Sequence, residues 1–585
     1  MNGAKRLFQR LVYHKVQHVF GYPGGAILPV LNEFYNQSSI QYILSRTEAG
    51  GSFMAEGYAK ATQKPGVVMV TSGPGAINIM TSLQNALSDG TPLLALTGQV
   101  ATTVIGTDAF QEADIVGISS PCTKWNHLLT DGTKIDYIVD KAFTSMMDTR
   151  HGPVLLDLPK NIMAGESGTQ YTAHEPPCAN IRVPGSNISI EDIHSLLLTA
   201  RRPMILAGQG VFQSDSVLQM REFLELYKVP ITTTLMGLGI VDERNRRSLK
   251  MLGMHGSFAA NMAIQHCDLL LNFGSRFDDR IIGNPKQFAP KATIVHIDIL
   301  PKNINKTIRT KYYRAENCHS TLEQLLNYNV LVDPYHTYQW WKQIHEWKRT
   351  MFTYTQKKVL QGRHVLATLN RIIQADRNNS YTIVSDVGAH QMWAAQFLDY
   401  DYPRVKFLTS GGLGTMGFAL PASIGVKIGV PQDRVICVCG DGGFLMTAQE
   451  LVTAIEHGVG IKVLILNNQY QLMVKIWQEK FYANRIVGTK MNNPPFEQIC
   501  RAYGCEALRV DSHEGLESAL QTFLAYDKGP IVLHAVTDSD ESVLPMVAPG
   551  CSLDTMILED NESEKGEGKE DKEHQDPRWK GDAPC

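Results

Sequence analysis

The stretch RVICVCGDGGFLMTAQELVTAIEHGVGIKVLILNNQYQL, residues 434–472, decides the fold. Its apolar run at 435–439 predicts a buried strand, which stops at a glycine-rich turn at 440–443. A helical pattern follows, and a second apolar strand at 462–466 delivers the pair Asn467-Asn468. Two parallel strands joined by a helix have their carboxyl ends side by side, where open α/β sheets bind ligands.

Oxygen ligands gather at these two strand ends. Asp441 offers a carboxylate and Asn468 an amide carbonyl, which suit a hard cation such as Mg²⁺ that is shared with a diphosphate. An isolated Asp-Gly pair is most often only a turn. The order Gly-Asp-Gly, a helix-sized interval and Asn-Asn after a strand resembles the diphosphate-binding motif of thiamine-diphosphate enzymes. That resemblance implies metal ligands at Asp441, Asn468 and the backbone carbonyl of Tyr470, and diphosphate contacts at Gly440, Gly442 and Gly443.

Length and composition are those of an ordinary globular protein with several domains. The 585 residues exceed one hydrophobic core, and roughly 150 residues per domain predicts three or four domains. With 19% charged residues and a formal net charge of -3, the chain has no basic field for nucleic acid or an anionic membrane. The sequence has no apolar run of about 18 residues, which excludes a spanning helix. Ten scattered cysteines without paired-ligand spacing are interpreted as reduced thiols.

Three α/β units follow one another, which predicts three doubly wound parallel-sheet domains. Their strands end in small or polar residues, as ligand-binding loops require, although plain turn chemistry is the alternative for the second unit. Trp340, Trp341 and Trp347 have helical spacing and are expected to pack rather than bind a cofactor. The predicted segments are a first domain (1–163), a linker (164–190), a second domain (191–335), a linker with a helical segment (336–363), a third domain (364–546) and a charged, mostly disordered tail (547–585).

Longer pieces extend the resemblance to nearly the whole globular part. They occur in order across residues 20–546 and include YPGGAILPV, EAGGSFMAEGYAKAT, TSGPGAIN, GTDAFQEADIVGIS, GPVLLDLPKN, RFDDR and TSGGLGTMG. With these pieces the chain resembles the catalytic subunit of acetohydroxyacid synthase, also called acetolactate synthase. The resemblance implies a pyrimidine-binding domain at 1–163, a central FAD-binding domain at 191–335 and a diphosphate-binding domain at 364–546.

The resemblance implies a carboligase (a transferase) that uses thiamine diphosphate, Mg²⁺ and FAD. It would decarboxylate pyruvate and condense the remaining fragment with pyruvate or 2-ketobutyrate, to give 2-acetolactate or 2-aceto-2-hydroxybutyrate for isoleucine and valine biosynthesis. Activation of the cofactor needs a carboxylic acid against its aminopyrimidine ring, and Glu48 matches that glutamate. An ordinary charge in the first turn of a helix is the alternative for Glu48.

The resemblance also carries over three groups of site residues. Beside Glu48, the active site would be lined by Gly25, Phe110, Gln111 and Lys160, and thiamine diphosphate would also contact Pro23, Asn78, Met416 and Met473. Flavin contacts would come from Arg150, Gly208, Gly210, Thr234, Leu235, Met254, His255, Gly274, Arg276, Arg280 and Asp298. The substrate and inhibitor channel would be lined by Ala101, Met254, Asp279, Arg280, Met473, Val474 and Trp477.

Several positions depart from the family pattern near the active site. Ala101 stands where proline is usual, a position associated with herbicide resistance, and Ala389 stands where glutamine is usual. Leu472 replaces a glycine, and we expect it to forbid a positive φ and to add bulk beside the metal loop. Further departures are Thr47, Ala49, Phe53 and Asn317. We expect an active, inhibitor-tolerant paralogue; the alternatives are a non-catalytic homologue that binds cofactors or partners, and a related carboligase or pyruvate oxidase.

Partners and location follow from the same resemblance. Glu48 and Asp441 lie on different predicted domains, and the family sets the glutamate of one subunit against the diphosphate site of another, so a homodimer is expected. A regulatory subunit is a further expected partner, and the substrates are small-molecule 2-ketoacids. The basic, amphipathic start is expected to be the first helix of the domain. The location would be mitochondrial if a presequence is missing from this chain, and cytoplasmic otherwise.

Overall fold

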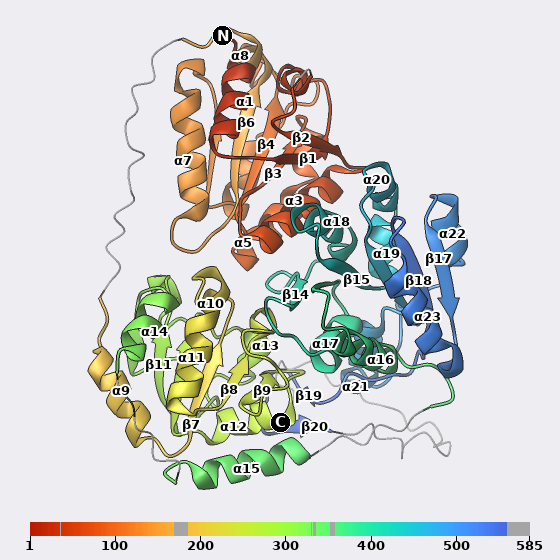
Figure 1. Ribbon diagram of the computed structural model, residues 1–585. Coiled ribbons are helices and arrows are strands. Elements are labelled where there is room, and N and C mark those ends of the chain that lie inside the picture. Colours follow the sequence, from red (N-terminus) through yellow and green to blue (C-terminus); the bar gives the residue numbers. More distant parts are fainter. Residues whose placement is uncertain (36, 169–184, 329, 331–334, 351–356, 559–585) are drawn as a thin grey trace, which may run out of the picture. The chain divides into compact units, whose positions relative to one another are not determined.

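The computed structural model describes the chain apart from residues 36, 169–184, 329, 331–334, 351–356 and 559–585. The described part contains three six-stranded parallel sheets with helices on both faces (Figure 1), which confirms the predicted α/β fold. The chain divides into two compact units. The first unit holds residues 1–182, 357–398 and 403–539, and the second holds residues 183–356, 399–402 and 540–585.

The first sheet lies in the first unit, in the N-terminal part of the chain. Its spatial order is β2 (Gln41–Leu44), β1 (His18–Tyr22), β3 (Gly66–Val70), β4 (Leu93–Gln99), β6 (Val154–Pro159) and β5 (Trp125–Leu128). Val67 and Met69 pack with α1 (Gly3–Tyr13) and α7 (Ile135–Met147), whereas Val68 and Val70 pack with α3 (Glu48–Thr62) and α5 (Met80–Asp89). Alternate residues face opposite sides of a sheet, so one apolar run serves two cores. Shorter helices are α2 (Leu28–Leu31), α4 (Pro74–Ile77), α6 (Ile115–Ser119) and α8 (Lys160–Ala164).

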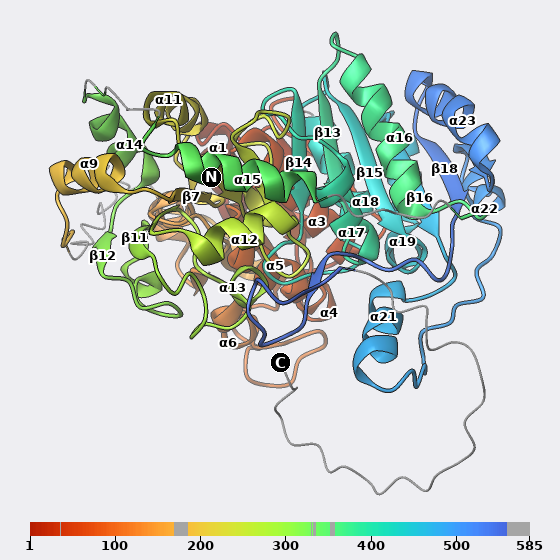
Figure 2. The same cartoon turned by 90° about the horizontal axis from the view of Figure 1, so that it is seen from below.

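The third sheet, also in the first unit, repeats the topology of the first. Its order is β14 (Val405–Thr409), β13 (Tyr381–Ser385), β15 (Arg434–Gly440), β16 (Lys462–Asn467), β18 (Ile531–Val536) and β17 (Glu506–Val510). Counted along the chain, both sheets read 2-1-3-4-6-5, and the order reverses between the first and third strands. Its helices are α16 (Gly362–Ala375), seen along the sheet in Figure 2, α17 (Ala389–Phe397), α18 (Ala419–Gly429), α19 (Asp441–Thr447), α20 (Glu450–Glu456), α21 (Leu472–Phe481), α22 (Phe496–Ala502) and α23 (His513–Ala525).

Between β15 and β16 the structure has two helices, where the sequence predicts one. The single helix expected between the two strands is divided into α19 and α20. The first of these begins at Asp441 itself, so the predicted glycine turn is the end of β15 followed by the first turn of a helix.

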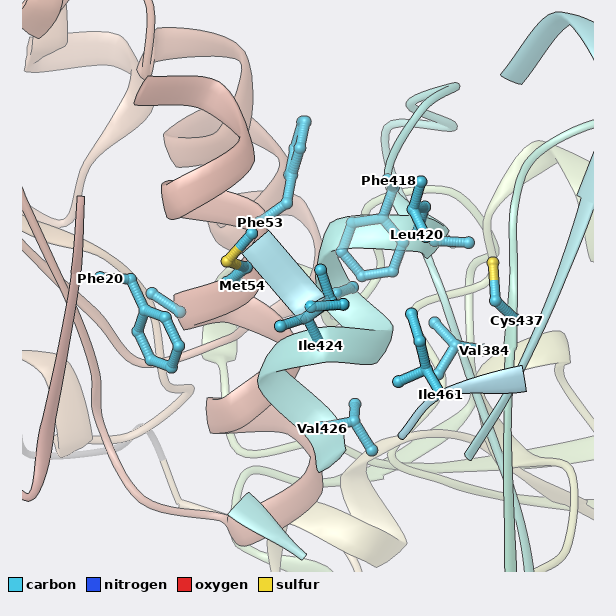
Figure 3. Close-up of a cluster of buried hydrophobic side chains, with 14 of the residues drawn as sticks. Phe20, Phe53, Met54, Val384, Phe418, Leu420, Ile424, Val426, Cys437 and Ile461 are labelled. Carbon is cyan, nitrogen blue, oxygen red and sulfur yellow. The ribbon is translucent and has the colours of Figure 1, made fainter. Parts of the chain in front are cut away.

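Helices α3 and α18 join the first and third sheets through one apolar core, part of which Figure 3 shows. Phe53 and Phe418 meet edge to face, with ring centroids 5.8 Å apart. The backbones approach so closely that a Cβ at Gly57 would overlap the carbonyl of Ala422, and one at Gly425 would overlap the carbonyl of Met54. The departure to phenylalanine at position 53 therefore lies in this core.

The central sheet lies in the second unit. Its order is β9 (Ser248–Met251), β8 (Ile231–Thr233), β7 (Pro203–Ala207), β10 (Leu269–Phe273), β11 (Thr293–Ile297) and β12 (Tyr312–Arg314). Counted along the chain this is 3-2-1-4-5-6, the order of dinucleotide-binding sheets. One face packs with α9 (Ile190–Thr199), α11 (Val217–Tyr227) and α14 (Cys318–Leu326), and the other with α12 (Phe258–His266) and α15 (Tyr338–Arg349). Other short helices here are α10 (Gly210–Gln213) and α13 (Asp279–Ile282).

Two peripheral segments belong to the same unit. Trp340 in α15 is buried, and its Nε1 donates to the carbonyl of Pro203 at 3.1 Å, which confirms that this stripe packs against the protein. A two-stranded hairpin of β19 (Met546–Val547) and β20 (Met556–Ile557) includes the start of the predicted tail. The rest of the predicted disordered tail, 559–585, and most of the predicted linker, 169–184, lie outside the described residues.

Across the described ranges, the model contains no helix with the length and apolarity needed to cross a membrane.

We expect Gly425→Ala to destabilise the first unit, because its methyl group would lie 1.8 Å from the backbone carbonyl oxygen of Met54, so the two helices would have to separate. Overpacking of this kind costs roughly 1–3 kcal/mol. Thermal melting would report the loss, with Gly185→Ala as the control, because a Cβ at Gly185 meets no atom of the described residues within 4 Å. Equal melting temperatures for the two variants would contradict the close crossing.

Candidate active site

Asp441 lies at the carboxyl end of β15 and is bonded to the end of the neighbouring strand. Its carboxylate accepts hydrogen bonds from the backbone N–H of Gln469 at 2.9 Å and from Nδ2 of Asn493 at 2.7 Å. Gln469 follows Asn468, whose Oδ1 accepts from the N–H of Tyr470 at 3.0 Å. Strands β15 and β16 pair directly. The structure thus brings the three predicted metal-ligating residues into two connected loops.

The chemistry of these groups fits a hard cation only in company with other oxygen ligands. In the part of the chain that the structure describes, no three His, Cys, Asp or Glu side chains are grouped so as to hold a metal ion. A cation at Asp441 would therefore depend on one carboxylate, amide and backbone carbonyl oxygens, and phosphate oxygens. Oxygen donors of this kind are those that Mg²⁺ takes.

His390 supplies a buried polar atom beside the same turn. Its Nε2 has no hydrogen-bond partner among the described residues, and the ring lies 3.0 Å from the position of a Cβ on Gly440. Burial lowers the pKa of His390 to about 4, although a hydrogen bond with the backbone of Asp386 raises it. A nearby anion would raise this pKa and satisfy the nitrogen. The site therefore fits a diphosphate, and His390 is a residue that the sequence analysis missed.

Asp386 holds the loop that carries Met416. Its carboxylate accepts the backbone N–H of Gly417 at 3.0 Å and that of Val387 at 2.7 Å. Burial raises the pKa of Asp386 to about 7, while these hydrogen bonds lower it. A Cβ on Gly443 would lie 2.6 Å from Oδ2 of Asp386, so the second glycine after Asp441 is required by close packing.

The sequence analysis also missed a series of hydrogen-bonded polar side chains that begins at Asp441. Asn493 donates to Oδ1 of Asn467 at 2.9 Å, and Nδ2 of Asn467 lies 2.9 Å from Nε2 of His534. The other ring nitrogen of His534 lies 2.7 Å from Glu497. These residues come from three separate segments, around 467, 493–497 and 534, so their spacing in the sequence gives no signal, and only the doubled asparagine marks one member.

Leu472, at the position where the family has glycine, does not take a positive φ. Leu472 is the first residue of α21, is buried, and is not among the residues with positive φ. The residue of this loop with positive φ is Gln469, at 61°. Leucine is unstrained in helical backbone, so the departure alters packing and leaves the backbone conformation ordinary. Ala389 similarly begins α17 as a buried residue.

Glu48 is the first residue of α3, in the first sheet's domain. Thr47 caps this helix by accepting the N–H of Gly50 at 3.0 Å. The Glu48 carboxylate accepts from Nδ2 of Asn78 at 3.1 Å, and a Cβ on Gly75 would lie 3.5 Å from it. The loops after β2 and β3 therefore meet at this carboxylate, at the carboxyl edge of the sheet.

The loop at 100–113 carries Phe110 and Gln111 and is closed by Gln99. The Gln99 side chain donates to the carbonyl of Ala113 at 3.0 Å and to Asp157 at 2.9 Å, and it accepts the N–H of Val100 at 2.9 Å. One amide group thus binds both ends of the loop. Phe110 is 88% exposed at its tip, and Gln111 has φ 61°, a conformation that non-glycine residues rarely adopt.

The remaining predicted residues of this domain lie at loops on the same edge. Lys160 begins α8 and is exposed, and its neighbour Asn161 accepts the N–H of Thr102 at 2.9 Å. A Cβ on Gly73 would lie 2.7 Å from the carbonyl oxygen of Gln111. The other predicted positions at this edge are Pro23, Gly25, Asn78 and Ala101.

The predicted flavin glycines meet at the switch point of the central sheet. Gly208 follows β7 and Gly274 follows β10, which are neighbouring strands. A Cβ on Gly210 would lie 2.6 Å from Cα of Gly274, and the N–H of Gly210 donates to the carbonyl of Gly274 at 3.1 Å. Only glycine permits the two backbones to come this close. Glycines at such a turn also let the diphosphate of a nucleotide approach the backbone.

Other predicted flavin residues lie in the same unit. Met254 donates its N–H to the carbonyl of Arg280 at 2.8 Å, and Nδ1 of His255 lies 3.3 Å from the carbonyl of Pro545. Asp298 accepts from Asn303 at 3.0 Å. The others are Thr234 and Leu235 after β8, and Arg276 after β10.

Two predicted sets are divided between the units. Arg150 belongs to the first unit, where its guanidinium donates to the carbonyls of Leu87 and Ser88 at 2.9 and 2.6 Å. Its flavin contact therefore stays a prediction. The substrate and inhibitor channel also stays a prediction, because its predicted residues belong to both units. The first unit contains Ala101, Met473, Val474 and Trp477, and the second contains Met254, Asp279 and Arg280.

Comparison with known proteins agrees with this geometry. The thiamine pyrophosphate enzyme families match with their N-terminal TPP binding domain at residues 1–118, their central domain at 190–325 and their C-terminal TPP binding domain at 386–535. The acetolactate synthase of Schizosaccharomyces pombe is 41% identical over 96% of this chain and 86% of that protein. The large subunit of Escherichia coli acetolactate synthase isozyme 2 is 40% identical over 95% of this chain and 99% of that subunit. The chain belongs to the acetolactate synthase family.

Membership of the acetolactate synthase family confirms the resemblance read from the sequence. The match to the N-terminal TPP binding domain covers β1 to β4 of the first sheet, and the match to the C-terminal TPP binding domain covers the third sheet from β14 onward. The match to the central domain covers the whole sheet with dinucleotide-binding order.

Asp157 gives the first domain a measurable pH dependence. Burial raises the pKa of its carboxyl to about 7, from an ordinary value of 3.8, while hydrogen bonds from Thr97 and Gln99 lower it. Between these values the folded chain holds a proton that the unfolded chain has lost, so stability falls as pH rises through about 7. The wild type should lose on the order of 2 kcal/mol of its free energy of unfolding through this group between about pH 5.5 and about pH 7.5. We expect Asp157→Asn to lack this loss.

Thermal melting at the two pH values would measure the effect. Asp131→Asn is the control, because hydrogen bonds to Thr133 lower the pKa of that exposed carboxyl and keep its titration below this range. An unchanged pH slope in Asp157→Asn would show that the buried group is ionised throughout.

Proposed function

We propose that the chain is a thiamine-diphosphate-dependent acetolactate synthase, a transferase that joins two 2-ketoacids. It decarboxylates pyruvate and condenses the two-carbon fragment with pyruvate or 2-ketobutyrate, giving 2-acetolactate or 2-aceto-2-hydroxybutyrate for valine and isoleucine biosynthesis. The observation that carries the proposal is the hydrogen bond between Asp441 and the Asn468 loop, at the carboxyl ends of the neighbouring strands β15 and β16 of the third sheet. Family membership supports the same reaction.

Cofactor activation is assigned to Glu48. When bound, thiamine diphosphate supplies the carbon nucleophile and accepts the electrons released with carbon dioxide. The Glu48 carboxyl would hold a proton against the aminopyrimidine ring, and Asn78 donates a hydrogen bond to one of its oxygens. The loop held by Gln99 presents Phe110 and Gln111 to the substrate, and Met416 packs against the cofactor.

The diphosphate is assigned to the third domain. Asp441, Asn468 and the carbonyl of Tyr470 hold Mg²⁺, and the glycine turn at 440–443 leaves room for the phosphates. Support comes from the oxygen donor set and from the unpartnered nitrogen of His390 beside Gly440.

FAD is assigned to the central domain. The close contact of Gly210 with Gly274, at the switch point of a sheet with order 3-2-1-4-5-6, supports this assignment. We assign the flavin a structural role beside the substrate channel, because the condensation is not an oxidation.

The active assembly is proposed to be a homodimer. No hydrogen bond joins Glu48 to the Asp441 turn among the described residues, which is consistent with the two serving different active sites. Segments around the site also carry large apolar side chains that are exposed in the single chain, at Tyr22, Ile77, Leu413, Leu445 and Met446. A second copy would cover them.

Further features of the family are proposed for this chain. The name of the E. coli relative, a large subunit, favours a smaller regulatory partner here. The S. pombe relative is named mitochondrial, which favours a mitochondrial location. The domain division at 1–163, 191–335 and 364–546, and reduced inhibitor sensitivity through Ala101 in the channel wall, are proposed on the same ground.

The decisive experiment is a colorimetric acetolactate assay with pyruvate, Mg²⁺, thiamine diphosphate and FAD. We expect product from the wild type and a loss of at least about 100-fold in Glu48→Gln, because the amide cannot protonate the ring. Glu191→Gln is the control, since Glu191 is likewise in the first turn of a helix but lies exposed on α9. Pyruvate consumption with oxygen uptake and no acetolactate would reject the proposal in favour of an oxidase.

A second experiment tests the flavin site. We expect Gly210→Val to purify without flavin absorbance, because its side chain would displace the backbone of Gly274. Gly185→Val, at a position with open space, should retain the absorbance of the wild type. Full flavin content in Gly210→Val would remove the assignment of FAD to this switch point.

A further inference from the structure

Glu450 is a fully buried carboxylate that holds the segment preceding Glu48. It belongs to α20 of the third domain and is 0% exposed. It accepts the backbone N–H of Arg46 and that of Thr47, each at 3.0 Å, and the hydroxyl of Thr47 at 3.1 Å. Thr453 donates to it at 2.9 Å. Both carboxylate oxygens are therefore used, and three of the four donors come from a segment about 400 residues away in sequence.

The local sequence is shaped around this contact. A Cβ on Gly50 would overlap Oε1 of Glu450, so the glycine in the first turn of α3 makes room for the carboxylate. The Thr47 hydroxyl donates to Glu450 while it accepts the N–H of Gly50. Capping of α3 and binding to Glu450 thus share one hydroxyl. Without the carboxylate, two backbone N–H groups and this hydroxyl would lose their partner in a partly buried segment.

A carboxylate of the first domain likewise holds a loop of the third domain. Asp89, on α5, accepts the backbone N–H of Gly411 at 3.2 Å and that of Gly412 at 2.6 Å, in the loop after β14 that carries Met416. The segment that Glu450 holds follows β2, which has the same place in the first sheet as β14 has in the third. Each domain therefore holds, with a carboxylate, the equivalent loop of the other. A contact made twice at equivalent places is a built feature of the fold.

We infer that Glu450 is a positioning residue for cofactor activation. It fixes the backbone at 46–47 and so sets the direction in which the first turn of α3 presents the Glu48 carboxyl. Glu450 makes no hydrogen bond with Glu48 itself among the described residues, so its action passes through the backbone. The inference rests on the proposed function of Glu48.

The test measures proton removal separately from binding. Purified full-length wild type, Glu450→Gln and Glu456→Gln would be loaded with thiamine diphosphate and Mg²⁺, and the hydrogen–deuterium exchange rate at C2 of the bound cofactor would be measured. A displacement of a catalytic group by about 1 Å costs on the order of 100-fold in rate. We expect Glu450→Gln to slow exchange by at least about tenfold, with the cofactor dissociation constant within about twofold of wild type.

Glu456→Gln is the matched control. Glu456 lies on the same helix and contacts the same residue, Arg46, but through the side chain and at the protein surface. Its exchange rate should equal that of the wild type, because exposed ion pairs of this kind contribute little.

The outcomes separate this inference from the proposed function. Wild type without exchange or acetolactate would reject the proposed function itself. An active wild type with unchanged exchange in Glu450→Gln, even with a lowered melting temperature, would make Glu450 purely structural and overturn the inference. If Glu450→Gln fails to fold, Thr453→Val decides, because it removes only the Thr453 hydrogen bond: slower exchange supports the inference, and an unchanged rate overturns it.

Discussion

Two helix backbones touch where α3 crosses α18, because glycine stands at both contact points, Gly57 and Gly425. Any side chain there would separate the helices and the two sheets packed behind them. The crossing sets the distance at which Glu450 reaches the start of α3 and Asp89 reaches the loop of Met416. The geometry of both loops therefore depends on two residues that have no side chain.

Buried carboxylates do much of the remaining positioning in this unit. Asp386 holds Gly417, Asp157 holds Gln99, and Glu450 holds Arg46 and Thr47, each from a site closed to water. Burial of a carboxylate is unfavourable unless donors satisfy it; the donors are backbone N–H groups of loops for Asp386 and Glu450, and the Gln99 side chain for Asp157. Each loop is thereby held in one conformation, and any displacement leaves a buried carboxyl group without partners.

The sequence predicted most of the architecture because apolar runs and glycine turns are local signals. The strands on either side of Asp441 and the pairing of their ends follow from such signals. It did not indicate which residue of the loop before Leu472 takes a positive φ, which the structure places at Gln469. Which residue of a short loop takes the strained conformation depends on how the following helix begins, and a single sequence does not determine that.

The residues that the sequence analysis missed lie outside the motifs that mark the site. His390 and Asn493 reach the site from other segments, and their roles depend on contacts made only after folding. The role of Glu450 likewise depends on a contact with residues about 400 positions away in the sequence. The repeated topology also bears on how such a chain changes over generations. Because each domain holds a loop of the other, a mutation that shifts one of these loops limits which substitutions the opposite domain can accept.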